Sequence, residues 1–292
     1  MRLAFDLLQA LDYEETGNNV AALATYSLGV GDPDRERLRL LDEHYNPSSR
    51  ALLESIGIEV GDRIADVGCG HGTMTAWLAR RVGPTGTIYA LDGSEQQLEI
   101  ARSTLHGLDH VRLLCATVED PPRSAHDLDW VYSRFLLLHL PDPLAGVRAM
   151  RRMLRAGGQL VLEVPDFGAL RFVPADPASG LWAKWWPQLG KTIGASYDVC
   201  ERTEDMLHAA GFEILRMDRY QPVSARREAK LLHALGFEQL VPAYLEQGGA
   251  RQWEIDAHRA FLERTIDDPS VRVELYTVTQ YVAVKRTRHD DA

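Results

Sequence analysis

The stretch that most limits the possible folds of this chain is ADVGCGHG, residues Ala65–Gly72, which follows an apolar run and precedes a helical pattern. It places three glycines in five positions. Glycine lets a backbone turn tightly and approach a ligand without collisions of Cβ. A helix that begins directly after such a turn presents free backbone N–H groups. The stretch therefore predicts a strand–turn–helix unit that binds a small ligand.

Short apolar runs alternate with helical patterns between about residues 60 and 165. This alternation is typical of βαβ units, whose right-handed crossovers place helices on both faces of a parallel sheet. The expected core strands are 63–68, 87–92, 111–116, 128–133 and 159–164, with helices over 73–81, 94–106 and 143–154. A helix and a strand over 201–220 and a last strand over 274–286 complete the pattern. The predicted class is α/β: a doubly wound, Rossmann-like, seven-stranded, mostly parallel sheet.

The segments around this core predict a helical lid or cap. We expect an N-terminal helical cap segment over 1–57, a ligand-binding core over 58–165 and a continuation of the core over 201–221. Residues 166–200 form a Pro- and Gly-punctuated insertion, and connections of that length usually have a function such as a lid. Residues 222–270 form a helical insertion or cap, and 271–292 hold the last core strand and a tail.

Composition argues against several classes of protein. The net charge of −10 comes with scattered basic residues, whereas nucleic-acid binders carry a basic stripe. No apolar run approaches the ~20 residues of a membrane span, and the N-terminus does not resemble a signal peptide. Three scattered cysteines lack metal-ligand spacing and fit a reduced cytoplasm. We therefore expect a cytoplasmic protein without a metal, a nucleic-acid partner or a membrane.

Two acidic residues flank the glycine turn. Asp66 lies two residues before the first glycine, and Asp92 lies 20 residues after Gly72 at the end of the next strand. A carboxylate at the second position can accept hydrogen bonds from two ribose hydroxyls. Nicotinamide oxidoreductases show G-x-G-x-x-G, whereas this loop is G-x-G-x-G, and its early acid suits an ammonium group better than a pyrophosphate. The pattern favours a ligand with an amino acid moiety and a ribose, and leaves a nicotinamide oxidoreductase as the alternative.

From about residue 35 to 219, the chain resembles the small-molecule branch of the class I S-adenosylmethionine-dependent methyltransferases, through IADVGCGHG, YALDGSEQQLEIAR, ATVEDPP, LDWVYSRFLLLHLPDP and LRAGGQLVLEVPDF. The resemblance implies S-adenosyl-L-methionine as cofactor, S-adenosyl-L-homocysteine as product and a small-molecule acceptor. It implies cofactor contacts at Asp66, Gly68, Cys69, Gly70, Gly72, Asp92, Gly93 and Gln97. Thr117, Val118 and Glu119 would lie near the adenine without the aspartate often found there, and Ser133 and Arg134 would line the methionine end through their backbone.

The string YSRFLLLHL also resembles the YSR-x4-HL segment of phosphoethanolamine methyltransferases, in which the histidine pairs with a tyrosine near the transferable methyl. This resemblance implies His139 and Tyr26 as a catalytic pair. The acid that contacts the phosphobase in that family is Phe135 here, which implies a different acceptor. The alternatives are a structural His139 bonded to a backbone carbonyl and a Tyr26 that only packs.

Aromatic residues in and before the 166–200 insertion indicate the kind of acceptor. Trp182, Trp185 and Trp186 fall at i, i+3 and i+4, on one helical face. Either this face docks onto the domain, or it contributes to an apolar acceptor site. The substrate-binding candidates are Phe135, Glu163, Phe167, Trp182 and Trp186, with surface placement as the alternative for Glu163.

The predicted function is methyl transfer to an apolar or aromatic, natural-product-like or quinone-like molecule, by a monomer or homodimer. Because a fold does not determine a function, a non-methylating cyclisation or rearrangement on the same fold remains an alternative. Besides the nicotinamide oxidoreductase named above, a macromolecular methyltransferase is the remaining alternative.

Overall fold

The computed structural model describes residues 34–286, which divide into two compact units. The first, here called the core unit, comprises Asp42–Phe167, Ser196–Pro222 and the described residues from Tyr276 onward. The second, the helical unit, comprises the described residues up to Leu41 together with Gly168–Ala195 and Val223–Leu275. Most of each insertion expected from the sequence therefore belongs to the helical unit.

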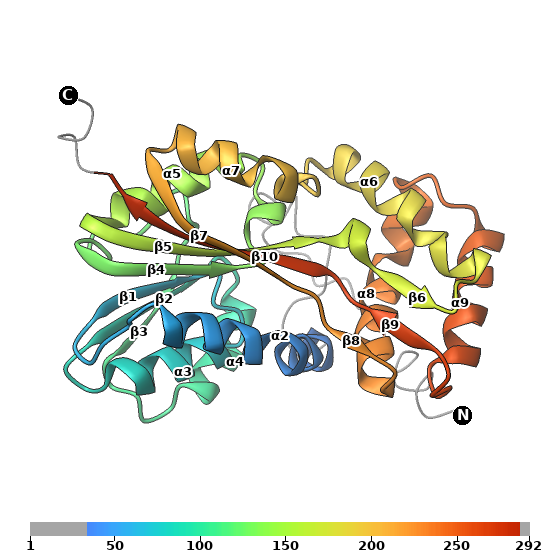
Figure 1. The fold of residues 1–292 in the computed structure, drawn as a ribbon, viewed down its shortest axis with the longest axis horizontal. Coiled ribbons are helices and arrows are strands. Elements are labelled where there is room, and N and C mark those ends of the chain that lie inside the picture. The colour runs from blue at the N-terminus through green and yellow to red at the C-terminus, as the bar shows by residue number, and fades with distance from the viewer. Residues whose placement is uncertain (1–33, 287–292) are drawn as a thin grey trace. The chain divides into compact units, whose positions relative to one another are not determined.

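A seven-stranded, mostly parallel sheet forms the centre of the core unit, as the sequence predicts (Figure 1). Its strand order is β3-β2-β1-β4-β5-β10-β7. Only β10 runs against its neighbours, because it pairs antiparallel with both β5 and β7. The strands are β1 (Arg63–Val67), β2 (Thr87–Asp92), β3 (Val111–Cys115), β4 (Leu128–Arg134), β5 (Leu154–Asp166), β7 (Phe212–Tyr220) and β10 (Thr277–Lys285).

Helices cover both faces of this sheet, and each face has its own apolar core. The helices of the core unit are α3 (Thr73–Val82), α4 (Glu95–Thr104), α5 (Pro143–Met153), α7 (Val199–Ala209) and the part of α2 (Arg35–Ser55) from Asp42 onward. On one face α2 and α3 bury side chains such as Leu53 and Leu78 against the sheet. On the other face, which α5 and α7 cover (Figure 1), Met150 and Leu207 are buried. Each such leucine or methionine contributes roughly 1.5–3 kcal/mol by leaving water.

The start of α5 shows how local sequence sets an element boundary. Asp142 accepts a hydrogen bond from the backbone N–H of Ala145, and Pro143 occupies the first helical position. The helix ends at Met153 because β5 begins directly at Leu154. The expected strand 159–164 is therefore too short, since the strand extends to Asp166 and pairs with both β4 and β10.

The last strand expected over 274–286 corresponds to β10, but its first residue, Glu274, belongs to a different sheet. Residues Arg272–Glu274 form β9, which pairs with β6 (Arg171–Val173) and β8 (Val223–Ser224) in a three-stranded sheet of the helical unit. The chain then passes into β10 of the core unit, whose hydrogen-bonding partners are β5 and β7. The apolar pattern runs across this break without interruption, so it does not reveal that the pairing partners change.

The helical unit has an aromatic core of its own. Besides its small sheet it contains α6 (Trp182–Ile193), α8 (Arg227–Glu246) and α9 (Gln252–Thr265). At its centre two buried histidines meet, with Nε2 of His233 and Nε2 of His258 3.1 Å apart, while Nδ1 of His258 donates to the carbonyl oxygen of Ala178 at 2.7 Å. Burial lowers the pKa of His258 to about 4 and that of His233 well below its ordinary value. Aromatic rings surround the pair: those of Phe172, Trp182, Trp185, Phe237 and Phe261.

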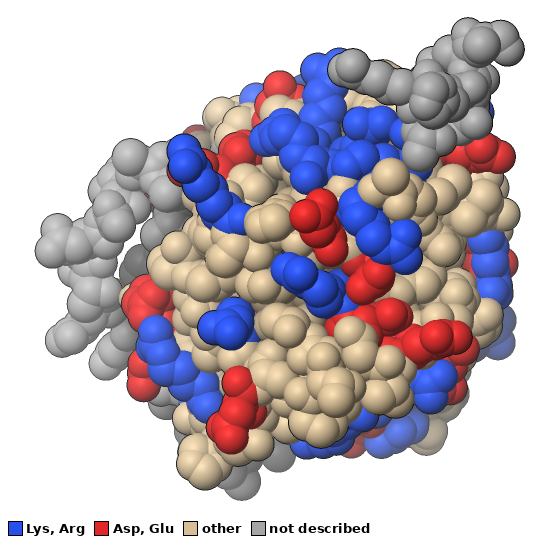
Figure 2. Space-filling model, turned by 90° about the vertical axis from the view of Figure 1, so that its left-hand side faces the viewer, with Lys and Arg blue, Asp and Glu red and all other residues tan. Residues whose placement is uncertain are grey.

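Charged side chains of both signs share the surface. Figure 2 shows a face on which basic and acidic side chains are intermixed. Two arginines of this region contact neighbouring segments: Arg155 of β5 pairs with Asp129 at 2.7 Å, and Arg151 of α5 donates to the carbonyl oxygen of Gly211 at 3.3 Å. Within residues 34–286, no helix has the length and apolarity that crossing a bilayer requires.

Candidate cofactor and acceptor site

The sheet topology identifies one edge of the core unit as a ligand site. Strand β1 pairs with β2 on one side and with β4 on the other. The chain therefore passes from β1 to β2 and β3 on one side, and then crosses to β4 on the opposite side of β1. In open α/β sheets, ligands bind beyond the carboxyl ends of the strands at such a switch point. The glycine turn, Asp92 and the segment after β4 all lie at these carboxyl ends.

The glycine turn has the backbone conformation that its sequence predicts. Gly68, Gly70 and Gly72 have φ values of 78°, 53° and 77°, in the left-handed region that side chains with Cβ avoid. A Cβ at Gly72 would also meet the side chain of Leu105 at 3.1 Å. At Gly70 a Cβ would meet nothing within 4 Å, so the space beside it is open for a ligand.

Asp92 is bonded to the glycine turn and keeps acceptor capacity. Its Oδ2 accepts from the backbone N–H of Gly70, and its Oδ1 accepts from that of Ser94, both at 2.9 Å. Burial raises the pKa of Asp92, and these two hydrogen bonds oppose the shift. Because each carboxylate oxygen can accept a second hydrogen bond, the group fits a ribose diol. Nothing lies within 4 Å of a Cβ built at the neighbouring Gly93, while Gln97 is buried at the start of α4.

Asp66 faces the interior beneath the start of α3. Its Oδ2 accepts from the hydroxyl of Thr75 at 2.6 Å. Burial raises the pKa of Asp66 to about 6, against the opposing effects of this hydrogen bond and of the Arg134 guanidinium. A ligand cation near Asp66 would favour its ionised form, so the residue fits a binding site for an ammonium group through its charge.

The three candidate residues after β3 differ in burial. Val118 is buried in the core between the sheet and α5, whereas Thr117 and Glu119 are exposed. The carbonyl oxygen of Glu119 accepts from Arg152 at 3.4 Å. Cys69, in the glycine turn, donates its backbone N–H to the carbonyl oxygen of Leu91 at 2.9 Å, and burial raises the pKa of its thiol well above the ordinary value.

Ser133 and Arg134 connect the end of β4 to other elements through their side chains. The hydroxyl of Ser133 donates to the carbonyl oxygen of Val67 at 2.8 Å, which holds β4 beside the last residue of β1. The guanidinium of Arg134 donates to Asn46, Ser49 and Asp42 of α2.

Sequence reasoning missed this polar row on α2. Asp42, Asn46 and Ser49 follow the spacing i, i+4, i+7, which brings them to one side of the helix. That spacing is visible in LDEHYNPSS, but the distant partner, Arg134, is not.

Glu163 is buried at the carboxyl end of β5, so surface placement is excluded. Its Oε2 accepts from the hydroxyl of Ser49 at 2.8 Å, and its Oε1 accepts from that of Tyr132 at 3.2 Å. Burial raises the pKa of Glu163, and the guanidinium of Arg134 opposes the shift.

The residues just after β4 leave the sheet through a strained turn. Phe135 has φ 57°, which is rare for a residue with a bulky side chain. His139 follows in the 3-10 turn η2 (Leu137–His139) and is partly buried. Its predicted partner, Tyr26, lies outside the described residues. The Tyr26–His139 pair therefore stays a prediction.

Aromatic rings gather at the same edge of the core unit. Phe135 packs edge-on against Tyr45, with ring centroids 5.3 Å apart. Phe167, just after β5, packs against Tyr276 at 4.5 Å and Tyr197 at 6.1 Å. The hydroxyl of Tyr45 donates to the carbonyl oxygen of Tyr276 at 2.9 Å, which links the two groups. We call these five residues the aromatic cluster.

The three tryptophans of α6 belong to the helical unit. Trp182 and Trp185 are buried in its aromatic core, and Trp182 packs on His233 with ring centroids 5.4 Å apart. Trp186 stacks on Trp182 at 6.1 Å and is less buried. Packing within the helical unit accounts for the positions of Trp182 and Trp185.

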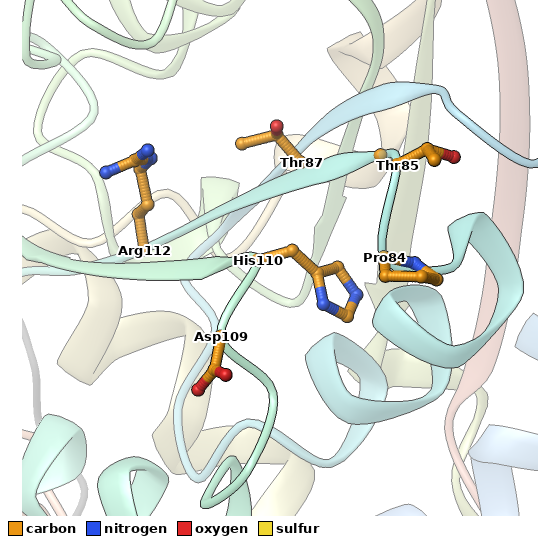
Figure 3. Close-up of a pocket in the computed structure, with 7 residues that line it drawn as sticks. Pro84, Thr85, Thr87, Asp109, His110 and Arg112 are labelled. Atoms are coloured by element: carbon orange, nitrogen blue, oxygen red, sulfur yellow. The ribbon is translucent and has the colours of Figure 1, made fainter.

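A hollow lies at the opposite end of the sheet from the glycine turn. It is open to solvent, measures about 380 Å³ and is lined by Pro84–Thr87, Asp109, His110 and Arg112 (Figure 3). These residues precede or begin β2 and β3, so the hollow is far from the carboxyl ends of the strands. In the described part of the chain, no group of three or more His, Cys, Asp or Glu side chains could hold a metal ion.

Comparison with protein families places the core in a known class. Residues 64–158 match the model of a family described as "Methyltransferase domain". Demethylmenaquinone methyltransferases of Staphylococcus aureus are 30% identical over 119 residues, which is 41% of this chain and 49% of theirs. The chain thus spans about half the length of the curated relatives it matches.

Solved structures share the fold at low sequence identity. A candidate methyltransferase from Bacillus halodurans C-125 has a TM-score of 0.56 and 20% identity, covering 82% of this chain and 100% of that one. The cyclase SpnF has a TM-score of 0.51 and 19% identity, covering 98% of this chain and 93% of its own. Residues 64–158 thus match a methyltransferase domain, and the solved structures share its fold.

Proposed function

We propose that this protein is an S-adenosylmethionine-dependent methyltransferase whose acceptor is a small apolar or aromatic molecule, of natural-product or quinone-like type. The observation that carries the proposal is that the glycine turn, Asp92 and the aromatic cluster occupy one edge of the core unit. The cofactor, when bound, supplies an electrophilic methyl group on a cationic sulfur.

The aromatic cluster suits the acceptor half of such a reaction. Phe135 and Phe167 are partly exposed, so planar apolar molecules can pack on their rings. Rings in this position orient the acceptor and exclude water, which is a large part of what methyl transfer requires. The similarity to demethylmenaquinone methyltransferases supports a quinone-like acceptor.

A phenolic acceptor must lose its proton, and His139 is the proposed proton acceptor. It follows β4 in the turn that begins with strained Phe135. A histidine is an effective general base near neutral pH, and Tyr26 would orient it.

We also propose that the protein acts in the cytoplasm, as a monomer or homodimer. Its net charge of −10 favours a free small molecule over a nucleic acid as the acceptor.

The test is incubation of the purified protein with methyl-labelled S-adenosylmethionine and a panel of phenols, quinols and isoprenoid quinols. Label in a product supports the proposal, and Asp92→Ala, which removes the ribose acceptor, is the negative control. A converted acceptor without label would instead support a cyclisation or rearrangement, a candidate favoured by the similar fold of SpnF. If the wild-type protein does not bind S-adenosylhomocysteine, both functions are rejected.

A further inference from the structure

A single carboxylate joins two segments of the core unit that lie on either side of the proposed cofactor site. Oδ2 of Asp42 accepts from the hydroxyl of Thr73 at 2.6 Å, and Oδ1 of Asp42 accepts from Nη2 of Arg134 at 2.8 Å. Thr73 is the first residue of α3, directly after the glycine turn, and Arg134 is the last residue of β4. Asp42 therefore connects the beginning of α3 to the end of β4.

The same face of α2 holds Arg134 from two further positions. Nη1 of Arg134 donates to Oδ1 of Asn46 at 2.7 Å and to the hydroxyl of Ser49 at 3.1 Å. The side chains of Arg134 and Asp42 are only 10% and 18% exposed, so solvent screens their ion pair weakly. Hydrogen bonds between charged groups are the stronger ones, and their geometry restricts both partners.

The backbone held by this network needs an external restraint. Phe135, next to Arg134, has φ 57°, a conformation that persists in a non-glycine residue only when its surroundings impose it. On the other side of the site, the turn before Thr73 contains three glycines, the residues with the greatest backbone freedom. Neither segment fixes its own position by local preference alone.

We propose that Asp42 is a positioning residue, which holds the start of α3 and the end of β4 at the separation that the amino acid end of the cofactor requires. This inference rests on the proposed function. Asp42 acts through Thr73 and Arg134, without touching the reacting atoms. Because one ligand moiety must contact both segments, loosening either bond weakens cofactor binding.

The experiment measures the Kd of S-adenosylhomocysteine by calorimetric titration of the full-length protein. Asp42→Asn and Thr73→Val should each raise this Kd about tenfold, the usual effect of losing a hydrogen bond to a charged group. Thr73→Ser keeps the hydroxyl and should stay within about twofold of wild type. The double variant Asp42→Asn/Thr73→Val should bind no more than about twofold more weakly than Asp42→Asn, because both changes remove the same bond. Glu54→Gln, at an exposed position of α2, is the matched control.

Three results would each overturn the inference while leaving the proposed function intact. The first is a Kd for Asp42→Asn within twofold of that of the wild type. The second is a Thr73→Ser protein that binds S-adenosylhomocysteine as weakly as Thr73→Val does. The third is a double variant in which the two single increases in Kd multiply. An Asp42 that only stabilises the fold gives the first of these, because a folded Asp42→Asn protein would then bind S-adenosylhomocysteine as the wild type does. If Asp42→Asn does not fold, the comparison of Thr73→Val with Thr73→Ser decides. A wild-type protein that binds no S-adenosylhomocysteine rejects the proposed function, and the inference with it.

Discussion

Acidification should destabilise the helical unit through its buried histidine pair. Because Nδ1 of His258 donates to the carbonyl oxygen of Ala178, its Nε2 must accept, and the facing Nε2 of His233 must donate. Protonation of His258 would set two donors against each other in an aromatic core. The pKa of His258 is therefore lower in the folded state than in the unfolded state, and so is that of His233.

The size of the effect follows from linkage. The pKa of His258 falls from an ordinary 6.5 to about 4, so the unfolded chain binds more protons than the folded one between these pH values. The stabilisation is complete above pH 6.5 and is lost as the pH falls toward 4. At pH 5, His258 alone should cost about 2 kcal/mol of unfolding free energy relative to pH 8. The lowered pKa of His233 adds to this loss of unfolding free energy at low pH.

Urea titrations at pH 8, 7, 6 and 5, followed by tryptophan fluorescence, measure this loss. Four of the six tryptophans belong to the helical unit: Trp182, Trp185, Trp186 and Trp253. The decisive quantity is the change between pH 8 and pH 5, compared between wild type and His258→Gln, since glutamine does not titrate. His106→Gln, at an exposed position, is the control. The reasoning is refuted if His258→Gln loses as much stability between pH 8 and pH 5 as the wild type.

Four further changes have defined outcomes. Gly70→Val should abolish S-adenosylhomocysteine binding in a calorimetric titration, because a β-branched residue avoids φ 53°; retained binding would contradict the assigned role of the turn. His139→Ala should lower kcat about 10²-fold or more with cofactor affinity nearly unchanged, and equal losses would indicate a structural histidine. Lys230→Met should cost about 3 kcal/mol in urea unfolding, because Nζ donates to three carbonyl oxygens at the end of α9 and beyond; a change under about 1 kcal/mol would exclude this role. Because Asp66 has a pKa raised to about 6, S-adenosylhomocysteine affinity should fall at least roughly threefold from pH 7 to pH 5, whereas Asp66→Asn should show no such fall.

Local sequence was sufficient for the parts of the site that lie within one strand–turn–helix unit. The glycines at 68, 70 and 72 have left-handed conformations, and Asp92 lies at the end of the next strand and bonds to the turn. These features follow from short-range sterics and from the regular spacing of βα units, both of which leave a pattern within about 30 residues.

Contacts between residues distant in the sequence determined the parts of the site that the sequence pattern could not predict. The partners of Arg134 lie 85 to 92 positions earlier in the chain, on a helix whose polar row is ordinary in sequence. The sequence around Glu163 fits either a surface position or a site position. In the folded protein Glu163 is buried, and its carboxylate accepts hydrogen bonds from Ser49 of α2 and Tyr132 of β4. Likewise, Trp182 and Trp185 of α6 pack against rings of α8 and α9, which are distant in sequence.

The sequence by itself determined the class of fold, the order of the core elements and the backbone conformation of the glycine turn, because each depends on local backbone preference and apolar periodicity. Only the tertiary structure decided that the last apolar run divides between two sheets. It alone brought Asp42, Thr73 and Arg134 together and buried two histidines against each other. Those contacts depend on which distant surfaces exclude water together, and no short stretch of sequence carries that information.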